Sequence, residues 1–275
     1  MADKINCFER AKTLLTAFTQ RVRLVFDRII HSTLFQKTAE SPKWRNFRTR
    51  LLRIKENIVA FTKQYPKTAA FIYVCLFCAF SIGFLDKPFA LYCLKAPDGG
   101  FWNLLAGLNP SGWWFLILAA LWLVYMTTAG LSLTTEVFEK NLMKARAVLL
   151  TAFALSLSSL VTLLLNIFTG RYIPEFLDTM KLYGFSAMRF RVSETSFPSF
   201  DVQSIWIVAV AAAFYLPRAK RWLYFTAGMI TLATVLTARC FISDAVMGTY
   251  IGIVMYSAAA WIVSENRENF PLISL

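Results

Sequence analysis

The run "AVLLTAFALSLSSLVTLLLNIF", residues 147–168, contains no charged residue. As an α-helix with a rise of about 1.5 Å per residue, it would cover about 33 Å, enough to cross a hydrocarbon core of roughly 30 Å. Across the whole chain of 275 residues, 57% are hydrophobic and 16% are aromatic. That content is too apolar for an ordinary soluble domain, so we predict an integral membrane protein built from α-helices.

Five further apolar runs accompany this one. The run at Ser204–Pro217 is short, and about 14 apolar residues is also the length of a buried core helix. Counting it as a span gives its neighbours a consistent topology, so we include it. We therefore predict an all-α fold, a six-helix transmembrane bundle over residues 68–264. Its other spans are Thr68–Leu85, Gly112–Thr135, Trp222–Thr237 and Ala245–Val263.

Basic residues are concentrated near the amino terminus, where fifteen of the 29 Lys and Arg precede residue 68. Since cytoplasmic loops carry an excess of Lys and Arg, we expect residues 1–67 to be cytoplasmic. The basic segments 136–146 and 217–221 and the tail 265–275 fall on the same side of a six-span topology. We therefore predict a multi-pass protein of the cell inner membrane with both termini cytoplasmic. The loop from Thr169 to Gln203 then faces outward, although it carries four basic residues, Arg171, Lys181, Arg189 and Arg191.

The region before the first span has a different character. In "SPKWRNFRTRLLRIKENIVAF", residues 41–61, Ser41 can cap a helix and Pro42 can occupy its first position. Apolar residues follow at three- and four-residue steps and basic residues fill the other positions, a pattern that Leu15–Ile30 repeats in part. This pattern predicts cationic amphipathic interfacial helices. We expect them to bind anionic membrane lipids and not nucleic acid, with a cytosolic protein partner as the alternative.

Three fragments distant in sequence are expected at the outer face. They are "NIFTGRYIPE" (166–175), which leaves the third span, "SFPSFD" (196–201), which enters the fourth, and "ARCFISDAVMGTYIG" (238–252), which joins the fifth and sixth. The predicted topology brings them to one end of the bundle. Polar groups gathered there are typical of a functional site in a membrane protein.

These fragments resemble the motifs of the type 2 phosphatidic acid phosphatase family, integral membrane enzymes with six transmembrane helices that remove phosphate from lipids. The first family motif, Lys-x-x-x-Gly-Arg-x-Arg-Pro, corresponds here to Asn166, Gly170, Arg171, Ile173 and Pro174. Asn and Ile therefore replace the Lys and the second Arg. The resemblance covers about residues 68–264.

The other two motifs also depart from the family pattern. The second motif, Pro-Ser-Gly-His, corresponds to Pro198, Ser199, Phe200 and Asp201. In the third motif an Arg and a His precede an Asp, and here Arg239 stands only five residues before Asp244, without the histidine. In the family mechanism one histidine attacks phosphorus and another protonates the leaving group. This chain has one histidine, His31, which lies in the predicted cytoplasmic region.

The resemblance therefore implies the phosphatase fold with a degenerate catalytic apparatus. We expect the site to bind an anionic lipid or a polyprenyl phosphate without hydrolysing it, through Asn166, Arg171, Ser199 and Arg239. We expect no cofactor. Arg239 is alternatively an ion-pair partner of Asp244.

Two other functions remain open from the sequence. One is an active lipid phosphatase or phosphotransferase that uses Asp201 and Asp244 as rewired carboxylates. Those two residues would then hold a metal ion, whereas the simpler interpretation makes each a helix cap. The other is a membrane adaptor that acts through its basic amino-terminal helices.

Overall fold

The computed structural model describes residues 42–95, 100–109 and 112–265. The chain divides into two compact units, 1–70 and 71–275, and each is described by itself. In the first unit, α3 (Pro42–Gln64) begins at the proline as predicted. Several of its apolar side chains are exposed, among them Leu51, Ile54 and Ile58. The predicted helix at Leu15–Ile30 and His31 lie outside the described residues.

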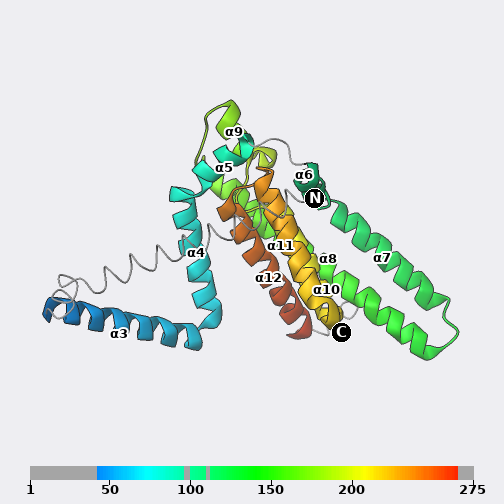
Figure 1. Cartoon of the computed structure of the whole chain (residues 1–275). Coiled ribbons are helices and arrows are strands. Elements are labelled where there is room, and N and C mark those ends of the chain that lie inside the picture. Colours follow the sequence, from blue (N-terminus) through cyan, green and yellow to red (C-terminus); the bar gives the residue numbers. More distant parts are fainter. Residues whose placement is uncertain (1–41, 96–99, 110–111, 266–275) are drawn as a thin grey trace, which may run out of the picture. The chain divides into compact units, whose positions relative to one another are not determined.

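The second unit is all-helical in its described part, apart from two isolated β-bridges (Figure 1). The chain enters it through α4, which begins in the first unit. The helices that follow are α4 (Pro66–Phe84), α5 (Asp86–Lys95), α6 (Gly100–Gly107), α7 (Trp113–Gly130), α8 (Thr135–Thr169), α9 (Pro174–Thr179), η1 (Val192–Glu194), α10 (Phe200–Tyr215), η2 (Pro217–Ala219), α11 (Lys220–Leu236) and α12 (Ile242–Glu265).

All six predicted apolar runs form helices, and the chain is a multi-pass membrane protein. Four of the described helices, α4, α7, α8 and α12, are long and apolar enough to cross a membrane. Two others, α10 and α11, have 16 and 17 residues, so the count of six spans stays a prediction. The basic segment 136–146, predicted as a cytoplasmic loop, is helical instead, because α8 already begins at Thr135.

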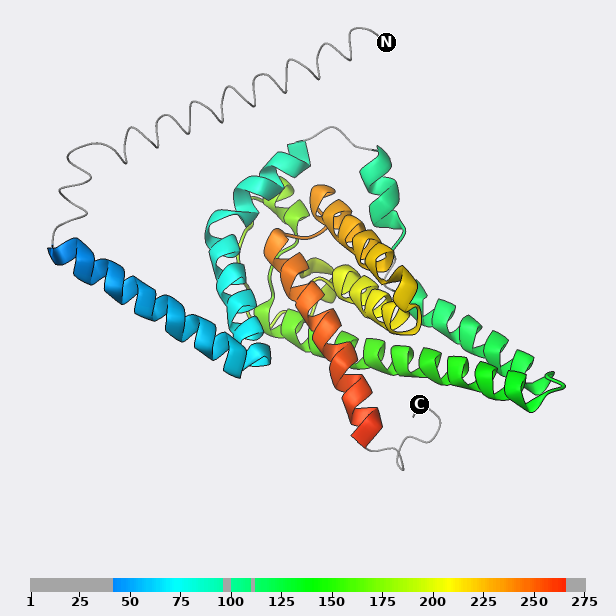
Figure 2. The same cartoon turned by 60° about the horizontal axis from the view of Figure 1, so that its bottom comes forward.

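The core of this unit lies where α8, α10 and α12 pack together (Figure 2). Leu155, Ile207 and Ala259, one from each helix, are buried in one hydrophobic cluster. Two glycines of α12 allow a close approach: a Cβ on Gly248 would lie 2.8 Å from the Ser199 oxygen, and one on Gly252 would lie 2.7 Å from the Gln203 oxygen. The four-residue spacing of Gly248 and Gly252 is typical of such close helix contacts.

Candidate functional site

The first motif begins where α8 ends. Gly170 has a left-handed conformation with φ of 56°, and its N–H donates to the Asn166 oxygen. A Cβ at this position would lie 1.8 Å from the Ser186 oxygen. Only glycine fits this conformation and this contact without strain. The turn directs the next residue, Arg171, into the interior.

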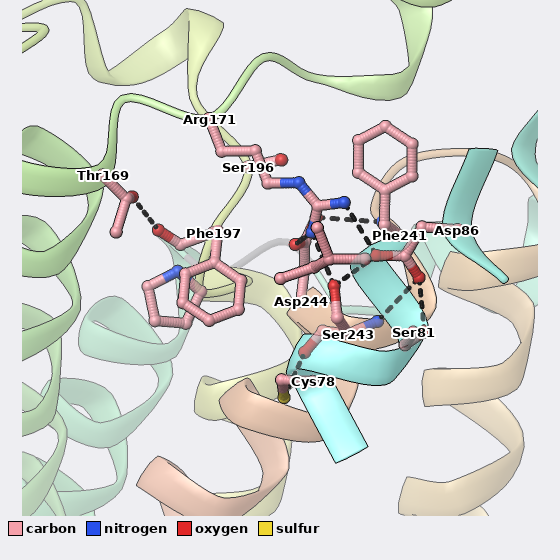
Figure 3. A network of polar contacts seen from close by, with 12 residues as sticks. Cys78, Ser81, Asp86, Thr169, Arg171, Ser196, Phe197, Phe241, Ser243 and Asp244 are labelled. Carbon is pink, nitrogen blue, oxygen red and sulfur yellow. Dashed lines mark hydrogen bonds and ion pairs between the residues drawn. The ribbon is translucent and has the colours of Figure 1, made fainter. Parts of the chain in front are cut away.

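Arg171 lies at the centre of a buried ionic cluster (Figure 3). Its side chain is fully buried and forms ion pairs with Asp86 Oδ2, at 2.7 Å, and with Asp244. Its guanidinium also donates to Ser243 Oγ at 2.5 Å and lies 4.2 Å from the centroid of the Phe241 ring. The cluster therefore joins the start of α5, the turn after α8 and the first turn of α12.

The two carboxylates are held by further donors. Asp86 accepts from Ser81 Oγ at 2.7 Å and from the Ser243 N–H at 3.2 Å. Asp244 accepts from the Phe241 N–H at 3.0 Å, as the third residue of a capping box does at the start of a helix. The predicted capping role of Asp244 is therefore confirmed. Its ionic partner is Arg171, and the alternative pair with Arg239 is wrong.

The charge state of Arg171 follows from these contacts. Burial alone lowers the pKa of Arg171, but the negative charges of Asp244 and Asp86 outweigh it, so the net pKa is raised above the ordinary value. A permanent cation between two carboxylates satisfies the need of a buried charge for close partners. Arg171 is thus a structural ion-pair residue in this fold.

Side chains of α8 hold the second motif in place through hydrogen bonds to its backbone. Asn166 is fully buried, and its Nδ2 donates to the Pro198 oxygen at 3.0 Å. Thr169 Oγ1 donates to the Phe197 oxygen at 3.0 Å. Ser199 caps α10 by accepting from the Val202 N–H at 3.4 Å. The cap is therefore Ser199, and the interpretation of Asp201 as the cap of this helix is wrong.

A cavity of about 540 Å³ opens beside these motifs, and we call it the Asp201 cavity. Residues with hydroxyl groups from η1, from the segment after it and from the cap of α10 are among those that line it. Two carboxylates, Glu175 and Asp201, and one cation, Arg239, supply its charge. The lining residues are Leu94, Ile173, Glu175, Ser193, Thr195, Ser196, Pro198, Ser199, Phe200, Asp201, Thr237, Ala238, Arg239 and Cys240.

Arg239 is the cation that reaches this cavity. It is exposed, and its guanidinium donates to the Ala106 oxygen at 3.3 Å, which leaves most of its five N–H groups for other partners. The neighbouring thiol, Cys240, is buried, and burial raises its pKa well above the ordinary value. A protonated thiol is a poor nucleophile. We therefore assign Cys240 a structural role in lining the cavity.

The structure divides the predicted site residues into two groups. Ser199, Asp201 and Arg239 line the cavity, whereas Asn166, Arg171 and Asp244 are buried behind it. Asp201 and Asp244 therefore do not share one open site. Among the residues that the structure describes, no cluster of three or more metal-binding side chains occurs.

Asp86, the second carboxylate of the cluster, was not among the site residues predicted from the sequence. Its position directly after the first apolar run, in "GFLDKPF", was a usable signal, because an acidic residue at the end of a span needs a partner there. Nothing in the spacing pointed to Arg171, which lies 85 residues further along the chain.

Comparison with known proteins agrees with this arrangement. Residues 147–268 match the PAP2 superfamily. The fold also matches the crystal structure of a transmembrane PAP2-type phosphatidylglycerolphosphate phosphatase from Bacillus subtilis, with a TM-score of 0.52 and 14% sequence identity over 74% of this chain and 98% of that one. No curated protein sequence matches the chain. The fold is that of a multi-pass helical membrane protein of the lipid phosphatase type. The match of residues 147–268 to the PAP2 superfamily, together with the match in fold, confirms the resemblance found in the sequence.

Proposed function

We propose that this chain is a catalytically degenerate member of the superfamily that binds a lipid headgroup in the Asp201 cavity without hydrolysing it. The observation that carries this proposal is the position of Arg171 and Asp244. Both residues occupy charged positions of the family motifs, and both lie in the interior, where Arg171 forms ion pairs with Asp244 and with Asp86. Neither lines the cavity.

The groups that do line the cavity are poorly suited to phosphoryl transfer. A covalent route needs a nucleophile that is available near neutral pH, and imidazole usually supplies it. Asp201 stands where the family histidine would be, and the one histidine of the chain is His31. An ionised carboxylate repels an incoming phosphate and does not donate a proton. The alternative of a rewired enzyme therefore lacks a protonating group in this cavity.

The charges of the cavity favour a particular class of headgroup. With Arg239 opposed by Glu175 and Asp201, a doubly charged phosphate monoester would meet net repulsion. A singly charged phosphodiester that carries hydroxyl groups can bond to Arg239 and to the Ser and Thr hydroxyls, and it gains from the amino-terminal dipole of α10. The supported ligands are thus phosphodiester lipids with glycerol or sugar headgroups, a subset of the predicted anionic lipids and polyprenyl phosphates.

A phosphate-release assay tests the catalytic part of the proposal. The purified protein in detergent, with a chelator present, is expected to release no phosphate from phosphatidate, phosphatidylglycerol phosphate or polyprenyl diphosphate. The variant Asp201→His should stay inactive, because it restores one motif residue without the second histidine or the phosphate-binding Lys. Chelator-resistant hydrolysis that disappears in Asp201→Asn would show that a carboxylate performs the chemistry.

A binding assay tests the headgroup. Retention of phosphatidylglycerol should fall about tenfold in Arg239→Gln, the loss expected for one charge-assisted hydrogen bond. The matched control is Arg191→Gln, an exposed arginine that lines neither the Asp201 cavity nor any other cavity described below. Deletion of residues 1–60 separates this function from the adaptor alternative, because cavity binding should survive it. Equal retention of phosphatidylglycerol by the Arg239 and Arg191 variants would argue against the site.

A further inference from the structure

A second cavity lies at the opposite end of α10 from the Asp201 cavity, and we call it the Lys220 cavity. Its volume is about 540 Å³, and side chains of α8, α10, α11 and α12 line it. The wall is mainly apolar and includes Leu150, Val210, Ala213 and Ala260. The two cavities share no lining residue, so a ligand in one does not touch the other.

The lining of this cavity carries positive charge only. Lys220 is the charged residue among those that line it, and none of the lining residues is acidic. Its Nζ lies 5.8 Å from the centroid of the Tyr224 ring, within the range of a cation–π contact. Two exposed arginines are close to it in the sequence, Arg218 in η2 and Arg221 in the first turn of α11. The cavity is therefore apolar within and cationic at its edge.

We propose that the Lys220 cavity binds one acyl chain of an anionic phospholipid whose headgroup phosphate pairs with Lys220. Basic pockets between transmembrane helices bind anionic headgroups, and an apolar wall without acidic residues suits a hydrocarbon chain. The volume falls in the range of about 300–1,000 Å³ that is typical of ligand sites. Trp261 and Tyr224 line the cavity, and such amphipathic rings prefer the level of the lipid headgroups.

Native mass spectrometry of the full chain provides the test. The protein is incubated in detergent with phosphatidylglycerol or phosphatidylcholine of identical chains, and the retained lipid is counted. Phosphatidylglycerol should be retained more strongly, and Lys220→Gln should reduce that preference about fivefold, as expected for one basic residue at a lipid surface. Ser257→Phe, which projects a ring from an exposed lining position, should reduce retention of both lipids. Free glycerol phosphate should not compete, because it has no chain.

Matched variants keep the result specific. Val254→Phe places the same ring at an exposed position of α12 that does not line the cavity, and it should retain lipid as the wild type does. Arg239→Gln, at the Asp201 cavity, should not change the effect of Lys220→Gln on lipid retention. A negative result for the Lys220 cavity can therefore be distinguished from a negative result for the Asp201 cavity. In nanodiscs, phosphatidylglycerol with brominated chains should quench the tryptophan fluorescence of the wild type more than that of the Trp261→Phe variant. Unchanged retention in both Lys220→Gln and Ser257→Phe would overturn the proposal.

Discussion

Arg171 shows how a motif residue can keep its place and change its role. In the sequence it occupies the arginine position of the first motif, and in the structure it is fully buried between Asp86 and Asp244. The sequence identified Arg171 and Asp244 as members of one region. It did not pair them, because contacts between residues 73 positions apart depend on the packing of α8 and α12 rather than on any local pattern.

We expect Arg171→Met to destabilise the protein by about 3–5 kcal/mol, since removal of one partner leaves buried charges without compensation. Thermal unfolding in detergent, followed by circular dichroism, measures the change. The control is Arg191→Met, because Arg191 is exposed and its contact with Glu194 Oε1 is 3.3 Å long. An exposed pair of this kind contributes only about 0.2–1 kcal/mol. Equal unfolding temperatures for the two variants would contradict a structural role for Arg171.

At the scale of helices, the sequence predicted more than it did for the site. Each apolar run became a helix because its length and composition leave few other structures in a membrane. The extension of α8 to Thr135 was missed, because its first turns carry Glu136, Glu139 and Lys140 and lack the apolar character of a span. The short helices α5, α6 and α9 were missed for a similar reason, since segments of six to ten residues give little periodic signal.

The contact between α10 and α12 makes a prediction with an internal control. A Cβ on Gly252 would lie 2.7 Å from the Gln203 oxygen and 3.0 Å from Trp206 Cβ, whereas one on Gly228 in α11 would meet nothing within 4 Å. Gly252→Ala should therefore cost about 1–3 kcal/mol through overpacking. Gly228→Ala should be neutral or stabilise by up to about 1 kcal/mol, because alanine is the better helix former. The same thermal unfolding measurement compares them, and a neutral Gly252→Ala would show that the helices can separate at little cost.

The amphipathic helix α3 allows a test of the amino-terminal region. A peptide of residues 41–61 should gain helicity and adsorb to vesicles that contain anionic lipid, because its basic side chains meet the surface charge while its apolar face enters the interface. Adsorption should weaken as salt rises, since screening shortens the range of charge interactions. Circular dichroism and sedimentation with vesicles measure both effects. Equal binding to neutral and anionic vesicles would contradict the electrostatic contribution and leave only the burial of the apolar face.

At the scale of the whole chain, the basic residues of the loop that we predict to face outward have a structural explanation. Residues 169–203 contain four basic and four acidic residues. Lys181 pairs with Asp178 at 3.8 Å, Arg189 and Arg191 pair with Glu194, and Arg171 is in the buried cluster. The hydrogen bond from Arg189 is the main reason that the pKa of Glu194 is lowered. These basic residues stabilise the loop itself, so their presence is compatible with an outer location.

The remaining prediction is the orientation of the chain in the membrane. Cysteines introduced one at a time at Lys181 and Leu133, in a Cys7→Ser background, lie at well exposed positions in the long loop and in the turn between α7 and α8. In intact cells a membrane-impermeant maleimide should label the Lys181→Cys protein and should label Leu133→Cys only after permeabilisation. The reason is the count of basic residues, which is highest before residue 68 and which holds that side in the cytoplasm. The four remaining native cysteines are the control, because three of the thiols are buried and Cys75 is partly so. The opposite labelling pattern would invert the topology, and the Asp201 cavity would then face the cytoplasm while the Lys220 cavity would meet the lipids of the outer leaflet.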